Sequence, residues 1–363
     1  MSTVTLFDSH NLFSSELKNR FVLAPLTRGR ATETRIPNKL MGDYYEQRAT
    51  AGLVITEATV ISEQGIGWID SPGIYTQDMV AGWKQIVDRV HNKDSKIVLQ
   101  LWHCGRASHS DFHHGELPFS ASDVAINGDG IHTSQGKKSY EAPRPMSKDD
   151  IQRTINDFKQ AAINAKQAGF DGVEVHAANG YLLNQFLDTK SNKRDDEYGG
   201  SIENRMRFLF EVLAAVKEVF DASQIGVRLS PNGVFNDMGC PDYRELYTTV
   251  IQRLNEQQLG FLHVMDGLAF GFHELGEPMT LDDIRPLFKQ TIIGNCGYTY
   301  ESASEAVASD QADLIAFGRP YISNPDLPDR YKNGWQVTPF DDASQWYGGG
   351  KEGYSDYPAF NAK

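Results

Sequence analysis

The sequence predicts a (β/α)₈ TIM barrel, and two observations carry the prediction. Eight short runs rich in branched apolar residues recur along the 363 residues, and segments with helical periodicity separate several of them. No Gly-x-Gly-x-x-Gly turn follows the first run, which disfavours an open dinucleotide-binding sheet. The predicted strands are 21–24, 53–56, 97–101, 173–175, 225–229, 261–264, 291–293 and 314–317.

Two of the intervening helices are clearly defined in the sequence. One follows Ser201, which is placed to cap it, and its apolar residues recur every three or four positions from Ile202 to Phe220. The other begins at Ser147, has Asp150 in the capping-box position and ends at Gly169. Each helix therefore has one apolar face to place against the strands.

The chain is longer than the minimum that this fold needs. A barrel takes about 250 residues, so the sequence predicts a single domain over 1–363 that carries extensions. The polar stretch at about 107–145, rich in Gly, His, Ser and Pro, is expected to form a long inserted lid after the third strand. A second extension is the aromatic, glycine-rich C-terminal tail at about 335–363.

The amino-acid composition indicates which kinds of partner the protein is expected to bind. The formal charge is −13, from 35 basic and 48 acidic residues, and no basic run occurs, which argues against nucleic acid and anionic membranes. No long apolar span or signal-like N-terminus is visible, so the expected location is cytoplasmic. Cys104, Cys240 and Cys296 are far apart and suggest buried thiols, with neither a disulfide nor a metal site. A small-molecule partner is expected.

Polar residues close the predicted strands, at the end where barrels of this type carry out their chemistry. A hydroxyl at Thr27, an amide at Gln100 and a guanidinium at Arg228 can together read a heteroaromatic ring that carries carbonyls and an N–H. The glycine-containing turns 294–297 and 317–320 follow strands seven and eight, the usual phosphate position of such barrels. The sequence therefore predicts a phosphorylated ring cofactor.

The stretch HAANGYLLNQFLD at 176–188, followed by SNKRDDEYGGSIENR at 191–205, resembles the signature of the old yellow enzyme family of FMN-dependent ene-reductases. The resemblance extends over nearly the whole chain. It includes Ala24-Pro25-Leu26-Thr27, the strand-end segments at 100–103, 227–231 and 316–320, and the tail at 347–358.

The resemblance implies which residues hold FMN. Thr27 would donate to the flavin C4 carbonyl, Gln100 would bond the pyrimidine edge, and Arg228 would lie near N1 and C2=O, where charge accumulates on reduction. The residues implied around the ring are Pro25, Leu26, Thr27, Ala58, Gln100 and Arg228, and those implied at the phosphate are Gly294, Asn295, Gly297, Gly318 and Arg319.

The resemblance also implies the catalytic groups. His176 and Asn179 would donate hydrogen bonds to the carbonyl oxygen of an activated alkene, and Tyr181 would protonate its α-carbon. Trp102 and Tyr347 would line the substrate pocket, whereas Phe235 and Phe270 are equally compatible with packing. NADPH or NADH would alternate with the alkene in the same site.

Several points stay open at this level. A monomer and a homodimer are both compatible with the sequence, and the physiological substrate and stereochemistry are not indicated. The segments 107–145 and 268–279 are expected to shape selectivity. Two alternatives are a metal-dependent hydrolase or lyase that uses His103, His176, Glu57 and Asp266, and a flavin-binding protein without turnover.

Overall fold

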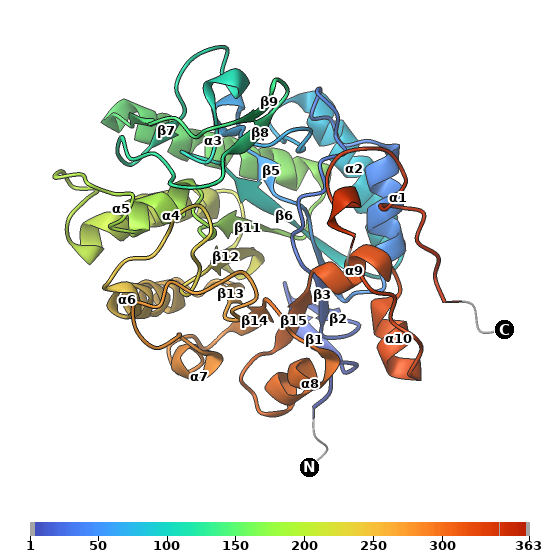
Figure 1. The fold of residues 1–363 in the computed structure, drawn as a ribbon. Helices are drawn as coiled ribbons and strands as arrows, with labels where there is room; N and C mark the ends of the chain where they lie inside the picture. The colour runs from blue at the N-terminus through green and yellow to red at the C-terminus, as the bar shows by residue number, and fades with distance from the viewer. Residues whose placement is uncertain (1–3, 341, 361–363) are drawn as a thin grey trace.

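The computed structural model describes residues 4–340 and 342–360, and within them eight parallel strands close into a barrel surrounded by helices (Figure 1). The eighth strand pairs with the first, and the third with the fourth, so the ring has no open edge. The (β/α)₈ prediction is confirmed. The barrel strands are β3 (Phe21–Leu23), β4 (Leu53–Ile55), β6 (Lys96–Trp102), β11 (Gly172–His176), β12 (Ile225–Leu229), β13 (Phe261–Met265), β14 (Thr291–Asn295) and β15 (Leu314–Phe317).

The helices follow the strands in alternation. Ser147 and Asp150 form the expected capping box of α3, Gly169 ends that helix in a left-handed conformation, and Ser201 caps α5. The helices are α1 (Lys39–Arg48), α2 (Gln77–His91), α3 (Lys148–Ala168), α4 (Leu182–Leu187), α5 (Ile202–Lys217), α6 (Tyr243–Glu256), α7 (Leu281–Ile284), α8 (Tyr300–Ala308), α9 (Arg319–Ser323) and α10 (Leu327–Asn333).

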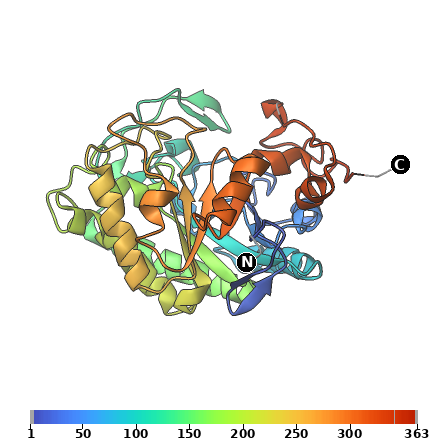
Figure 2. The same ribbon diagram turned by 90° about the horizontal axis from the view of Figure 1, so that it is seen from below.

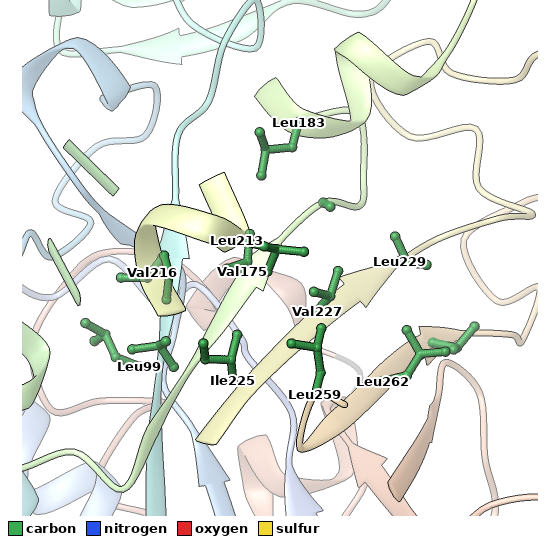
Figure 3. Close-up of a cluster of buried hydrophobic side chains, with 14 of the residues drawn as sticks. Leu99, Val175, Leu183, Leu213, Val216, Ile225, Val227, Leu229, Leu259 and Leu262 are labelled. Carbon is green, nitrogen blue, oxygen red and sulfur yellow. The ribbon is translucent and has the colours of Figure 1, made fainter. Parts of the chain in front are cut away.

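The main apolar core lies between the barrel and its helices. Figure 3 shows Val175 of β11 beside Leu213 of α5, with Val216 on the same helix and Val227 and Leu262 on the following strands. All of these side chains are buried. Side chains alternate across a strand, so the intervening residues of β11 and β12 point into the barrel. The inward residues determine what the barrel mouth can bind.

An N-terminal hairpin closes the bottom of the barrel. Its strands β1 (His10–Leu12) and β2 (Ser15–Leu17) are antiparallel, and Figure 2 shows the hairpin at the end opposite the C-terminal tail. Leu12 and Leu17 are buried in one cluster with Val22, Leu53 and Leu314 from three barrel strands. The lower interior is thus apolar, and polar side chains gather nearer the mouth.

The segment 107–145 contains short elements over the upper end of the barrel. Its β8–β9 pair is an antiparallel hairpin, and β10 pairs in parallel with β7. Its role as a lid and the single-domain interpretation stay predictions. The elements of this segment are a 3₁₀ helix (Ser110–Phe112), β7 (Phe119–Ser120), β8 (Ile131–Thr133), β9 (Gly136–Lys138) and β10 (Arg144–Pro145). Outside this segment, the chain also forms β5 (Thr59–Val60) and 3₁₀ helices at Glu63–Gly65, Ala222–Gln224 and Ala343–Gln345.

Two buried arginines fasten the C-terminal tail to the mouth. Arg28 donates from Nε to the Trp346 carbonyl at 2.7 Å and from Nη2 to the Gly353 carbonyl at 2.8 Å. Arg30 donates from Nη2 to the Gln345 carbonyl at 2.9 Å. These bonds hold Tyr347 over the barrel opening. Among the described residues, no helix is long and apolar enough to cross a membrane.

Candidate functional site

Two connected cavities open at the carboxyl ends of the strands. The inner cavity has a volume of about 580 Å³ and the outer cavity about 1250 Å³, and both are bordered by Trp68, Tyr181, Phe235, Phe270 and Tyr347. The predicted site residues that line the inner cavity are Pro25, Leu26, Thr27, Asn179, Tyr181, Arg228, Asn295, Gly297, Gly318, Arg319 and Tyr347.

The other predicted residues lie just behind that lining. Gln100 and His176 are 1% and 4% exposed and stand on adjacent strands of the barrel. Ala58 and Trp102 are buried in the cluster that contains Tyr181, so Trp102 supports this tyrosine from behind. Gly294 is buried within β14. Their contacts with cofactor or substrate stay predictions.

His176 has a fixed tautomer. The backbone N–H of Ala178 donates to Nδ1 at 3.3 Å, so Nδ1 carries no proton and Nε2 carries it. Burial, helped by the nearby Arg228 and His263, holds the pKa of His176 well below its usual value, so the ring is neutral. Nε2–H makes no hydrogen bond within the described residues. His176 is therefore built to donate one hydrogen bond to a ligand.

Asn179 occupies a backbone conformation that few residues tolerate. Its φ is 57°, in the left-handed region where Asn is among the favoured non-glycine residues. The backbone is pinned from both sides: its N–H donates to Ser230 Oγ at 2.8 Å, and its carbonyl accepts from Asn236 Nδ2 at 2.9 Å. The side-chain amide has no partner in the described chain and borders the inner cavity.

Tyr181 lies between two aromatic rings. Its ring meets His176 edge to face at 5.1 Å and Trp102 edge to face at 5.0 Å between centroids. Burial raises the pKa of the Tyr181 phenol well above its usual value, and nearby Cys104 and Tyr140 add to the effect. The phenol thus keeps its proton at neutral pH, beside both cavities.

Arg228 is the side chain that most clearly indicates a ligand-binding role. It is 6% exposed, donates from Nη2 to Asn295 Oδ1 at 2.8 Å and forms no salt bridge with any described residue. Its Nε is buried without a hydrogen-bond partner in the described part of the chain. Burial lowers the pKa of Arg228, whereas Glu174 opposes that shift. An unpaired buried guanidinium is costly, so it indicates an electron-rich group in the inner cavity.

The far end of the inner cavity suits a phosphate. Gly297 has a φ of 94°, and Cys296 before it has a φ of 89°, a strained value for a residue with a side chain. Arg319 stands between the rings of Phe270 and Trp346, 4.6 and 5.2 Å from their centroids. Cys296 and Trp68 also line the inner cavity. They were not assigned to the site from the sequence, because nothing in the neighbouring sequence marks either residue as a binding residue.

The proposed metal ligands are not assembled. Glu57 accepts from the backbone N–H groups of Arg28 and Gly29 at 3.0 and 3.1 Å, and Asp266 accepts from Tyr298 at 2.7 Å. Across residues 4–340 and 342–360, no three His, Cys, Asp or Glu side chains are grouped to hold a metal ion. Glu57 and Asp266, two of the four residues named for a hydrolase, therefore have other structural partners.

The sequence matches the model of the NADH:flavin oxidoreductase / NADH oxidase family over residues 5–337. The chain belongs to this family. Within this family, the chain is of the old yellow enzyme type. An old yellow enzyme homologue from Zymomonas mobilis superposes on it with a TM-score of 0.94 at 40% identity, covering 98% of this chain and 100% of that one. The resemblance seen in the sequence is confirmed, and the protein is a flavin-dependent oxidoreductase.

Other relatives also match this member of the old yellow enzyme family over almost the whole chain. Putative 12-oxophytodienoate reductase 2 from Oryza sativa subsp. japonica is 40% identical over 360 residues, 98% of this chain and 94% of the relative. Flavin oxidoreductase hxnT from Emericella nidulans is 37% identical over 381 residues, 97% of each chain. Morphinone reductase superposes with a TM-score of 0.92 at 40% identity, covering 99% of this chain and 97% of that one.

Proposed function

We propose that the protein is an FMN-dependent ene-reductase that uses NADPH or NADH. When bound, FMN would accept hydride from the nicotinamide and pass it to the β-carbon of an α,β-unsaturated carbonyl or nitro compound. The proposal is carried by two hydrogen-bond donors that have no partner in the described part of the chain, the Nε2–H of His176 and the side-chain amide of Asn179. They lie near a cavity lined by Arg228, whose buried Nε also has no partner among the described residues.

The residues of the inner cavity fit an isoalloxazine. Arg228 supplies a buried cation that an electron-rich pyrimidine edge would satisfy, and Thr27 supplies a hydroxyl. A fixed cation at that edge favours the negative charge that reduction brings. Gly297, Gly318 and Arg319 line the same cavity and provide backbone N–H groups and a cation for the phosphate.

The chain's own groups would then act on the alkene. His176 and Asn179 hold its carbonyl oxygen, and each donor of this kind is worth about 10² to 10³ in rate because it stabilises the charge that develops there. Tyr181 delivers its phenolic proton to the α-carbon, which becomes basic as hydride arrives at the β-carbon. The buried phenol is protonated at neutral pH, as this role requires.

The outer cavity supports bulky substrates. Its volume is about 1250 Å³, and apolar side chains such as Ile126, Phe272 and Leu275 form much of its wall. The names of the relatives refer to 12-oxophytodienoate and morphinone, and one morphinone reductase structure holds tetrahydroNAD. We therefore include large activated alkenes and a nicotinamide among the expected ligands.

The visible spectrum of the purified protein tests the proposal. We expect a yellow protein that anaerobic NADPH or NADH bleaches and that cyclohexenone re-oxidises. A yellow protein that neither nicotinamide bleaches would favour the alternative of a flavin-binding protein without turnover. A colourless protein that takes up no added FMN would refute the proposal.

A further inference from the structure

A buried polar network lies inside the barrel beneath the proposed flavin. Glu174 of β11 is 0% exposed, and its neighbour in register on β6 is Gln100. Gln100 donates from Nε2 to Glu174 Oε1 at 2.7 Å, and His263 Nδ1 bonds Glu174 Oε2 at 2.7 Å. Because β11 and β13 are not adjacent in the sheet, Glu174 and His263 can meet only in the barrel interior.

The network fixes which end of the Gln100 amide is free. A carboxylate only accepts hydrogen bonds, so the amide nitrogen of Gln100 must face Glu174. The amide oxygen then remains for a ligand, and it makes no hydrogen bond with any described residue. A glutamine held in this way offers an acceptor, which selects a ring that presents an N–H between carbonyls.

We infer that Glu174 is a positioning residue for the cofactor: it orients Gln100 so that the amide oxygen, and not the nitrogen, meets the N–H of the flavin pyrimidine edge. The inference rests on the proposed function. His263 holds the second carboxylate oxygen and so prevents Glu174 from turning. Burial lowers the pKa of His263, and Glu174 opposes this shift while Arg228 adds to it, so the imidazole is a neutral hydrogen-bond donor to Glu174.

The dissociation constant of FMN provides the test, in a double-mutant cycle on the full chain. Glu174→Met removes the acceptor with little change in size, and we expect FMN to bind about 10- to 100-fold more weakly, the range for a buried amide that loses its partner. Gln100→Met removes the amide itself. In the Gln100→Met background, Glu174→Met should then have little further effect, because Glu174 acts through Gln100.

Two further variants separate positioning from general damage. Glu174→Gln has one acceptor oxygen for two donors, Gln100 Nε2 and His263 Nδ1, and only the orientation that accepts from Gln100 frees the Gln100 oxygen. FMN binding should therefore weaken by at least about twofold, but by less than in Glu174→Met. This variant carries the cycle if Glu174→Met does not fold, which circular dichroism reports. Asp171→Asn is the matched control, because Asp171 precedes the same strand at the bottom of the barrel, where it bonds Lys96 and His91.

The outcomes are distinct. Unchanged FMN affinity in a folded Glu174→Met, or full additivity with Gln100→Met, overturns the inference while leaving the proposed function intact. A loss in Asp171→Asn as large as in Glu174→Met also overturns it, because the effect would then be general instability. Wild-type protein that binds no FMN overturns the proposed function and the inference together.

Discussion

His176→Ala separates two roles of one imidazole, and the structure gives a magnitude for each. The substitution removes the acceptor of the Ala178 N–H and the edge-to-face contact with Tyr181. An unsatisfied buried N–H costs about 1 to 3 kcal/mol and an aromatic pair about 0.5 to 1.5 kcal/mol, so the free energy of unfolding should fall by about 1.5 to 4.5 kcal/mol. Losing the Nε2–H donor should slow reduction of the alkene by about 10² to 10³.

Two matched variants assign these effects. In His176→Asn, Oδ1 takes the place of Nδ1 and can accept from Ala178, but no N–H reaches the position of Nε2. We expect this variant to recover much of the lost stability and little of the rate. In His176→Gln the longer side chain carries an N–H toward the Nε2 position, so part of the rate should return.

The assay follows the flavin absorbance in anaerobic stopped flow, with cyclohexenone re-oxidising the reduced protein, and chemical denaturation gives the free energy of unfolding. The reasoning is refuted if His176→Ala re-oxidises at the wild-type rate. It is also refuted if His176→Asn restores rate and stability together, because the ring would then act only by holding the loop that contains Asn179.

Three other substitutions test separate parts of the site. Tyr181→Phe should slow alkene-dependent re-oxidation by about 10² to 10⁴ while leaving reduction by NADPH nearly intact; equal slowing of both reactions in stopped flow would count against the proton role. Burial raises the pKa of Asp266 to about 6, so this carboxyl stabilises the fold below its unfolded pKa and the stabilisation is lost as pH rises through about 6. Denaturation at several pH values should therefore show Asp266→Asn gaining about 2 to 3 kcal/mol on wild type across that interval, and parallel curves would contradict this. Arg28→Met should destabilise the fold by about 1 to 3 kcal/mol and speed trypsin cleavage after Lys351 in the tail, because the Gly353 carbonyl loses its donor and the Trp346 carbonyl keeps only Arg30. Lys84→Met, at an exposed helix position, is the control, and equal cleavage in both would disprove the fastening role.

The barrel was predictable because its signals are local. The strands 225–229 and 314–317 have the same bounds in the sequence prediction and in the structure, since each is a continuous buried run bordered by polar residues. The ends of α3 were equally clear, because Ser147, Asp150 and Gly169 satisfy the unpaired groups at the helix ends by short-range bonds.

The interior network was not predictable in the same way. Glu174 sits within the apolar run 172–175, and its environment depends on Gln100 and His263, which are 74 and 89 positions away. Likewise, the sequence resemblance assigned Trp102 to the substrate pocket, but only the packing shows that its ring lies against Tyr181. In both cases the environment of the side chain depends on contacts between residues that are far apart in the sequence, and the local sequence does not indicate these contacts.

The hairpin at the bottom of the barrel has a consequence for biosynthesis. Leu12 and Leu17 precede all eight barrel strands in the chain, but Leu314 of the same cluster belongs to the barrel strand that is made last. Throughout translation the nascent sheet therefore has an open edge at β3, the kind of edge that pairs with other chains. Arrival of β15 joins that edge and seats the two leucines in a single event, so the barrel closes only after all eight of its strands have been synthesised.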